Sequence, residues 1–113
     1  MLAKKFRLPV EKWIKDKNKK IASKKSDFFI LKTNPNNLGF NRFGVVISSK
    51  VYKSSVKRNQ LKRTIFDFIR LKKLYEVSNK NSGRDFLIIV LPPVVKLTKE
   101  KINKELKNFF YNE

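Results

Sequence analysis

Apolar residues recur every three or four positions in three stretches of the chain, a spacing that is typical of helices. The first stretch is residues 9–20, where Pro9 suits an initial helical turn. The second is residues 55–75, which a serine at its start can cap. The third begins at Thr98 and places apolar residues at i, i+4, i+7 and i+8 up to Phe110. We therefore expect three helices.

Continuous apolar runs predict the strands. Runs at 28–31 and 43–48 are separated by the turn-forming residues 34–39, so we expect these two strands to pair antiparallel. The run 86–91 is apolar at every position, which is typical of a strand covered on both faces. Residues 76–83, between the second helix and this strand, are expected to form a loop.

The resulting order is helix, strand, strand, helix, strand, helix, with room for one further strand before the second helix. This order predicts the α+β class, as an α-β sandwich with a small central mixed sheet. Helices should bury one face of the sheet, and part of the other face can stay open. The 113 residues, 41% of them hydrophobic, suffice for one core, so we expect a single domain spanning 1–113.

The charge of the chain points to its partner. Lys and Arg number 28 against 9 Asp and Glu, which gives a formal net charge of +19. The segment Val56–Arg63 alone carries four cations and two side-chain amides, and Asp67 is the one acid between Lys50 and Lys73. A merely solvated face normally mixes both signs. A dense polyanion, with nucleic acid as the first candidate, is therefore the expected partner.

The residue types present leave little room for protein-borne catalysis. The chain has no Cys and no His, which excludes disulfides, thiolate metal sites and nucleophile–histidine pairs. Its aspartates are scattered and its three Gly are isolated, so neither a metal cluster nor a phosphate-binding Gly loop is expected. No secretory signal is evident, and the longest apolar run is too short to cross a bilayer, so a cytoplasmic location is expected.

Aromatic residues divide into two groups. Trp13 and Phe66 have cationic neighbours, and each could either stack on an unpaired base or pack half-buried. The others that stand out are expected in the core: Phe28, Phe29, Phe68, Phe86, Phe109 and Phe110.

Three segments together resemble a known family. They are the Gly-bearing strand 43–50, the basic helix start 58–63 with the sequence Arg-Asn-Gln-Leu-Lys-Arg, and the Asp-led strand 85–90. In their order and spacing they are similar to the protein subunit of bacterial ribonuclease P. The opening Arg7-Leu8 followed by Trp13 also fits, and the resemblance covers nearly all of the chain.

The resemblance implies a function. It implies a non-catalytic protein subunit of a tRNA-processing endoribonuclease, whose active site is RNA. That ribozyme would remove the 5′ leader of precursor tRNA by Mg²⁺-dependent hydrolysis, with the Mg²⁺ held mainly by the RNA. The implied partners are the catalytic RNA and precursor tRNA, with no membrane and no small-molecule ligand. The family fold also implies a left-handed βαβ crossover, which is rare in general.

The resemblance also implies two sets of binding residues. Those expected to bind the catalytic RNA lie on and just before the basic helix: Lys50, Lys53, Lys57, Arg58, Asn59, Gln60, Lys62, Arg63 and Arg70. Those expected to line a cleft for the leader come from the first helix, a strand and the basic helix: Trp13, Lys17, Ile30, Lys32, Lys62 and Phe66. Gln60, Ser49 and Phe66 stand where relatives commonly have a cation.

Two other classes share the high positive charge. A ribosomal or other structural RNA-binding protein would lack the spacing from Gly44 to Arg63. A DNA-binding module is less favoured, because no tight helix-turn-helix pair precedes the basic helix.

Overall fold

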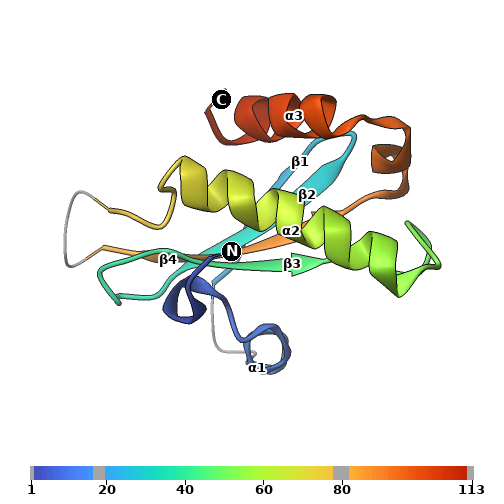
Figure 1. Cartoon of the computed structure of the whole chain (residues 1–113). Coiled ribbons are helices and arrows are strands. Elements are labelled where there is room, and N and C mark those ends of the chain that lie inside the picture. Colours follow the sequence, from blue (N-terminus) through green and yellow to red (C-terminus); the bar gives the residue numbers. More distant parts are fainter. Residues whose placement is uncertain (1, 17–19, 78–81, 112–113) are drawn as a thin grey trace.

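The computed structural model describes residues 2–16, 20–77 and 82–111. In chain order its elements are η1 (Lys4–Phe6), α1 (Val10–Lys15), β1 (Ala22–Lys25), β2 (Phe29–Pro35), β3 (Arg42–Val46), α2 (Ser55–Leu71), β4 (Arg84–Val90), η2 (Pro92–Lys96) and α3 (Lys99–Tyr111). Helices α2 and α3 lie over one side of the sheet, and α1 lies on the other side (Figure 1). The predicted α+β sandwich is thereby confirmed.

The sheet has four strands in the order β1-β2-β4-β3. β4 pairs antiparallel with β2 and parallel with β3. The expected antiparallel pairing of the runs 28–31 and 43–48 is therefore wrong, because β4 lies between them. β4 is apolar on both faces and takes the centre, where both faces can be covered. The left hand that the resemblance implies for the β3–α2–β4 crossover stays a prediction.

Strand β1 has no counterpart in the apolar pattern. Its residues, Ala22 to Lys25, are all exposed, and it pairs only along β2 at the edge of the sheet. Lysines at a sheet edge discourage pairing with another chain. Because a polar edge strand leaves no apolar signature, the pattern allowed for a further strand without placing it.

The second and third helices lie close to their predicted bounds, whereas the first is shorter than the predicted 9–20, because Asp16 already has an extended backbone. Ser54 caps α2 by accepting a hydrogen bond from the Lys57 backbone N–H at 3.3 Å, which confirms the serine cap. The helix ends at Leu71, four residues before the predicted end, and Lys73 adopts a left-handed backbone with φ 52. α1 ends at Lys15; residues 17–19, and 78–81 of the predicted loop, lie outside the described residues.

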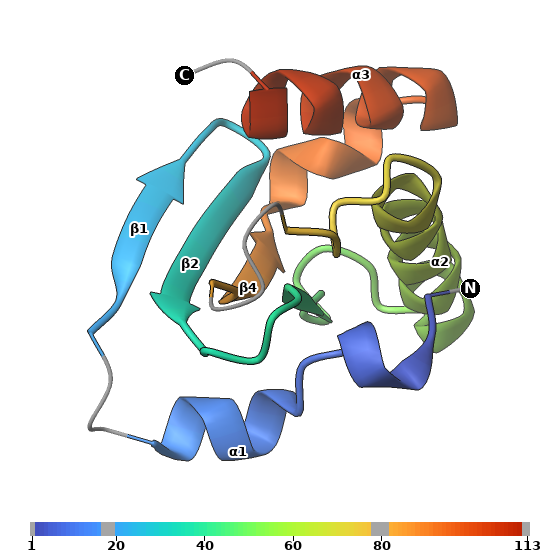
Figure 2. The ribbon, with the colours of Figure 1, turned by 90° about the vertical axis from the view of Figure 1, so that its left-hand side faces the viewer.

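The main core fills the space between the sheet and the two long helices. Phe29, Ile65, Ile88 and Leu106 are fully buried there. The six phenylalanines expected in the core all belong to this cluster or pack against it: Phe28, Phe29, Phe68, Phe86, Phe109 and Phe110. A second, smaller cluster of Leu8, Trp13 and Leu87 joins α1 to the opposite face of the sheet (Figure 2).

Asp85, at the start of β4, fixes the turn between β2 and β3. Its carboxylate accepts two hydrogen bonds from Arg42, both at 2.8 Å, and one from Asn36 Nδ2 at 2.8 Å. Asp85 is 3% exposed, so a charge at this position requires such partners. Hydrogen bonding to Asp85 raises the pKa of Arg42, so Arg42 keeps its positive charge. The end of the sheet beside β3 is thereby held in place.

Gly44 leaves room for α1 to approach the sheet. A Cβ at this position would lie 2.6 Å from Val10 Cγ2 and 3.3 Å from Leu87 Cδ1. Val10 is β-branched and has few ways to turn aside. The position of α1 therefore requires that residue 44 of β3 has no side chain.

We expect Gly44→Ala to push α1 away from the sheet and to lower the free energy of unfolding by about 1–3 kcal/mol, the usual cost of overpacking. Trp13 is the only tryptophan of the chain, so its emission should shift to the red as it becomes more exposed. Adding Val10→Ala should restore much of the loss by making room for the new methyl group. Unchanged emission and stability in Gly44→Ala would show that α1 does not depend on this contact.

Candidate nucleic-acid interface

Helix α2 has one apolar side and one cationic side. Leu61, Ile65 and Ile69 are buried against the sheet. On the other side, four of the residues predicted to bind RNA are exposed: Asn59, Lys62, Arg63 and Arg70. The predicted division of this helix into a core face and a binding face is therefore present.

Phe66 departs from that division. It projects among the cations but is 2% exposed and belongs to the main core. The N-terminal segment contributes to the same core, since Leu2 belongs to it and Phe6 packs against it. The ring of Phe6 stacks on Tyr75 at 4.2 Å between centroids, which ties this segment to the residues that follow α2. Of the two roles left open for Phe66, packing is confirmed.

A first hollow, here named the Arg63 hollow, lies between α2, the N-terminal segment and β3. Its volume is about 270 Å³. Its described lining residues are Arg7, Leu8, Val10, Gly44, Val45, Asn59, Lys62, Arg63 and Phe66. The Lys62 ammonium lies 5.8 Å from the centroid of the Phe66 ring, within range of a cation–π interaction. Cations thus surround an apolar floor.

A second hollow, here named the Trp13 hollow, lies between α1 and the sheet. It has a volume of about 480 Å³. Its described lining residues are Trp13, Ile14, Asp16, Ile21, Lys32, Val46, Leu87 and Ile89. Gly44 and Val46 are two positions apart in β3 and so share one face of the sheet, where they pair with Leu87 and Ile89 of β4. The two hollows therefore share this face of the sheet, and the Arg63 hollow also reaches the β3 edge, where Val45 and α2 line it.

Trp13 forms a wall of its hollow and offers little open ring surface. It is 7% exposed, and its Nε1 donates a buried hydrogen bond of 2.7 Å to Asn34 Oδ1 on β2. The packing role left open for Trp13 is thus confirmed. The indole fixes α1 on the sheet and shapes the hollow beside Lys32.

The residues predicted for a leader cleft are divided between these hollows. Trp13 and Lys32 line one, and Lys62 and Phe66 line the other. Ile30 pairs with Ile89 in the sheet, so it faces the same side without lining either described hollow. Lys17 lies outside the described residues. Sequence reasoning assigned neither Arg7 nor Asn34 to the site, since Arg7 was noted only for the resemblance and Asn34 only as a turn former.

The side chain of Arg58 binds the backbone of the loop that precedes α2. Its Nη1 donates hydrogen bonds to the backbone carbonyls of Tyr52 at 2.7 Å and Lys53 at 2.9 Å. The side chain is half-buried. Arg58 therefore folds back and holds the loop that leads into α2, and its predicted contact with the catalytic RNA stays a prediction.

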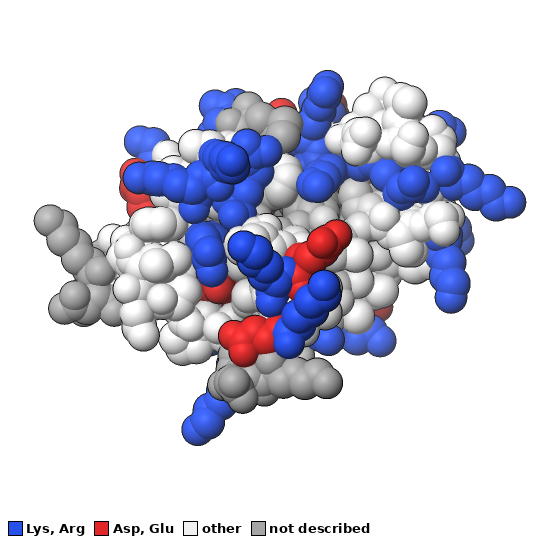
Figure 3. All heavy atoms as spheres, turned by 90° about the horizontal axis from the view of Figure 1, so that it is seen from below, with Lys and Arg blue, Asp and Glu red and all other residues white. Residues whose placement is uncertain are grey.

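The remaining predicted RNA-binding residues are exposed. Lys50 and Lys53 lie in the loop that Arg58 holds, and Gln60 follows in α2. Lys57 places its ammonium 5.9 Å from the centroid of the Tyr52 ring. Lys and Arg side chains also spread over the face of the molecule on which α1 lies, with few acidic side chains among them (Figure 3). Cations thus extend beyond the predicted surface onto the face of the molecule that carries α1.

Other kinds of site are not seen in the described part of the chain. Within residues 2–16, 20–77 and 82–111, no three His, Cys, Asp or Glu side chains gather as metal ligands would. Over the same ranges, every helix is too short or too polar to cross a bilayer. The geometry is that of a cationic surface with two apolar-floored hollows, which can hold a phosphate backbone and its bases.

Comparisons with known proteins agree on one family. The sequence model of the family described as Ribonuclease P matches residues 2–112. The RNase P protein from Thermotoga maritima, solved in complex with 1-(4-fluorophenyl)-2-thiourea, is 21% identical, with a TM-score of 0.77 over 95% of this chain and 99% of that chain. The Staphylococcus aureus RNase P protein is 23% identical, with a TM-score of 0.78 over 92% of this chain and 91% of that chain.

A mutant of the Staphylococcus aureus protein with defective mRNA degradation activity is also similar. It is 22% identical, with a TM-score of 0.77 over 94% of this chain and 86% of that chain. At these identities the structural likeness shows a shared fold, in agreement with the predicted architecture.

The position of Arg58 leads to a test of its role. We expect Arg58→Gln to lower the free energy of unfolding by about 1–2 kcal/mol, because two backbone carbonyls lose a charged donor. Arg63→Gln removes the same charge from an exposed position of the same helix and should change stability by less than about 0.5 kcal/mol. Urea titrations of both variants provide the measurement. Equal effects would show that the Arg58 hydrogen bonds add nothing to stability.

Proposed function

Because the chain belongs to the ribonuclease P protein family, we propose that its cationic α2 surface binds the catalytic RNA and that its two hollows hold the 5′ leader of precursor tRNA. Members of this family are components of a tRNA-processing ribonuclease. The protein then acts as the RNA-binding subunit of a ribonucleoprotein endonuclease.

The observation that carries this proposal is the exposed cationic side of α2. Lys62 and Arg63 are exposed there, and Asn59 adds a donor and an acceptor for sugar or base contacts. Arg63 can bind a phosphate with two parallel hydrogen bonds. Each phosphate that such a side chain neutralises releases counterions, so binding should weaken steeply with added salt. Lys50, Lys53 and Lys57 extend the surface toward the loop before the helix.

The proposed leader site combines apolar floors with cationic rims. Leu87 and Ile89 form part of one floor beside Lys32, and Phe66 forms part of the other beneath Lys62. Such surfaces suit an extended single strand, because bases contact apolar surface while phosphates meet cations. None of these contacts selects one base over another. We propose that the leader is held without strict sequence preference.

The proposed reaction is hydrolysis of one phosphodiester bond, which releases the leader and leaves a 5′-phosphate on the tRNA. The described acidic residues form no group that fits a metal ion, so the proposal assigns the Mg²⁺ to RNA phosphates. The residues of this chain bind and orient the two RNAs and screen the repulsion between their phosphates. We propose that the protein performs this function in the cytoplasm.

Reconstitution tests the proposed role directly. Purified protein should stimulate leader removal by ribonuclease P RNA at low Mg²⁺, and Lys62→Glu should weaken the affinity for that RNA by about tenfold and lower its salt slope by about one. Lys101→Glu is the matched control, since Lys101 is exposed on α3 and lines none of the described hollows. Absence of stimulation would favour a structural RNA-binding protein without a linked reaction.

The leader site has its own test in the reconstituted holoenzyme. Lys32→Glu places an acid beside the Trp13 hollow and should weaken binding of precursor tRNA several-fold, with little change for mature tRNA, which lacks the leader. Equilibrium binding of the two substrates, compared with Lys101→Glu, gives the measurement. An equal loss for both substrates would place the leader elsewhere.

A further inference from the structure

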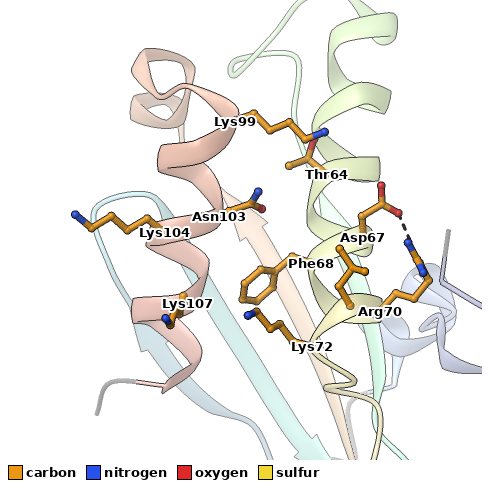
Figure 4. A pocket seen from close by; sticks show the side chains of 10 residues that line it. Thr64, Asp67, Phe68, Arg70, Lys72, Lys99, Asn103, Lys104 and Lys107 are labelled. Carbon is orange, nitrogen blue, oxygen red and sulfur yellow. Dashed lines mark ion pairs between the residues drawn. The ribbon is translucent and has the colours of Figure 1, made fainter.

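A further groove, distinct from the Arg63 and Trp13 hollows, lies between α2 and α3 where the two helices run beside each other (Figure 4). Its volume is about 460 Å³. Its lining residues come from both helices: Thr64, Asp67, Phe68, Arg70, Leu71, Lys72, Lys99, Asn103, Lys104 and Lys107. None of them lines the Arg63 hollow or the Trp13 hollow. This groove is therefore separate from the proposed leader site.

The groove continues toward the start of α2. A neighbouring hollow of about 670 Å³ shares Thr64, Asp67 and Lys99 with it and adds Tyr52, Lys57, Gln60, Leu61, Arg63, Val95 and Ile102. The two together, here named the α2–α3 trough, run along most of α2. Lys57, Gln60, Arg63 and Arg70 are among the residues expected to bind the catalytic RNA, so the trough borders that surface on its α2 wall, whereas its α3 wall adds residues outside the expected set.

The walls of the trough are strongly cationic. Its described lining includes one acid, Asp67, whose Oδ1 lies 3.9 Å from Arg70 Nε. Against it stand Lys57, Arg63, Arg70, Lys72, Lys99, Lys104 and Lys107. In Figure 4, Lys99 and Asn103 of α3 and Lys72 of α2 point toward the space between the helices, whereas Lys104 points away from it.

The spacing of the polar residues fits a polymer with regularly spaced charges. Lys99, Asn103 and Lys107 follow one another at i, i+4 and i+8, so they form a row along α3 with steps of about 6 Å. Of the exposed large apolar side chains in the described part of the protein, Leu71 (68% exposed) and Val95 (43% exposed) line the trough, one in each of its two hollows. An acidic protein partner would be expected to meet a contiguous apolar patch. The charge pattern favours RNA over such a partner.

We propose that the α2–α3 trough binds a second phosphate-backbone segment of the catalytic RNA, so that RNA contacts α2 on both of its exposed sides. The proposal rests on the proposed function, because it assumes that the RNA partner binds α2 at all. Lys99 and Lys107 contact phosphates from the α3 wall, and Lys72 does so from the end of α2. Asn103 lies between them and offers a donor and an acceptor to the sugar.

The test uses single charge reversals on one helix. Lys99→Glu and Lys107→Glu should each weaken binding of the full-length protein to ribonuclease P RNA by about tenfold and lower the salt slope by about one. Lys101→Glu makes the same change of charge on α3 but lies outside the trough, so it reports the long-range effect of net charge alone. Trp13 emission confirms that each variant is folded.

The outcomes separate this inference from the proposed function. If Lys62→Glu weakens binding while Lys99→Glu and Lys107→Glu behave like Lys101→Glu, the trough proposal is overturned and the proposed function stands. If no reversal has an effect, both are overturned. A photoreactive side chain in place of Asn103 should cross-link to RNA in the purified holoenzyme. Cross-links to a second copy of the protein, or none, would also overturn the trough as an RNA site.

Discussion

Burial of β4 on both faces is the constraint on which the rest of the structure depends. Its residues alternate between the main core, with Ile88 fully buried, and the smaller cluster, with Leu87 3% exposed. One face requires α2 and α3, and the other requires α1 and the segment before it. Because both of its faces must be covered, β4 lies inside the sheet, between β2 and β3. Gly44, next to Leu87, then lets α1 approach closely.

The covering of that second face creates the proposed binding surface. Because α1 is short, it covers only part of the sheet, and the Trp13 and Arg63 hollows remain on either side of Val10 and its neighbours. Phe66 is buried in the main core and lines the Arg63 hollow together with Arg7 and Leu8, so a side chain on the cationic side of α2 forms part of its floor. The same packing that stabilises the fold thus determines where cations and apolar surface meet.

Much of this could be predicted from the sequence. The three helices, the apolar strands and the two faces of α2 follow from spacing, because burial of apolar side chains selects those periods. Strand order could not be predicted, since the runs 28–31 and 43–48 would satisfy an antiparallel pair equally well. β1 could not be placed either, because an exposed edge strand with two lysines has no apolar pattern.

The candidate site shows the same limits. The motif 58–63 predicted a helix with exposed cations, which α2 has, but a one-dimensional pattern cannot tell that Arg58 turns back to Tyr52 and Lys53. It also could not show that Phe66 is buried in the same core as Leu2, which is distant from it in the chain. The α2–α3 trough arises from two helices that meet only in the folded molecule, so its cations belonged to no single motif.

The surplus of cations also affects how the free protein behaves. The ion pairs described above join Arg42 to Asp85 and Arg70 to Asp67, whereas the net charge is +19, so folding brings many like charges together. Any polyanion that binds the folded chain better than the unfolded one removes part of this repulsion and shifts the folding equilibrium. Conformational stability and ligand occupancy are therefore coupled in this molecule, and dilute buffer without polyanions is the condition in which the native state is weakest.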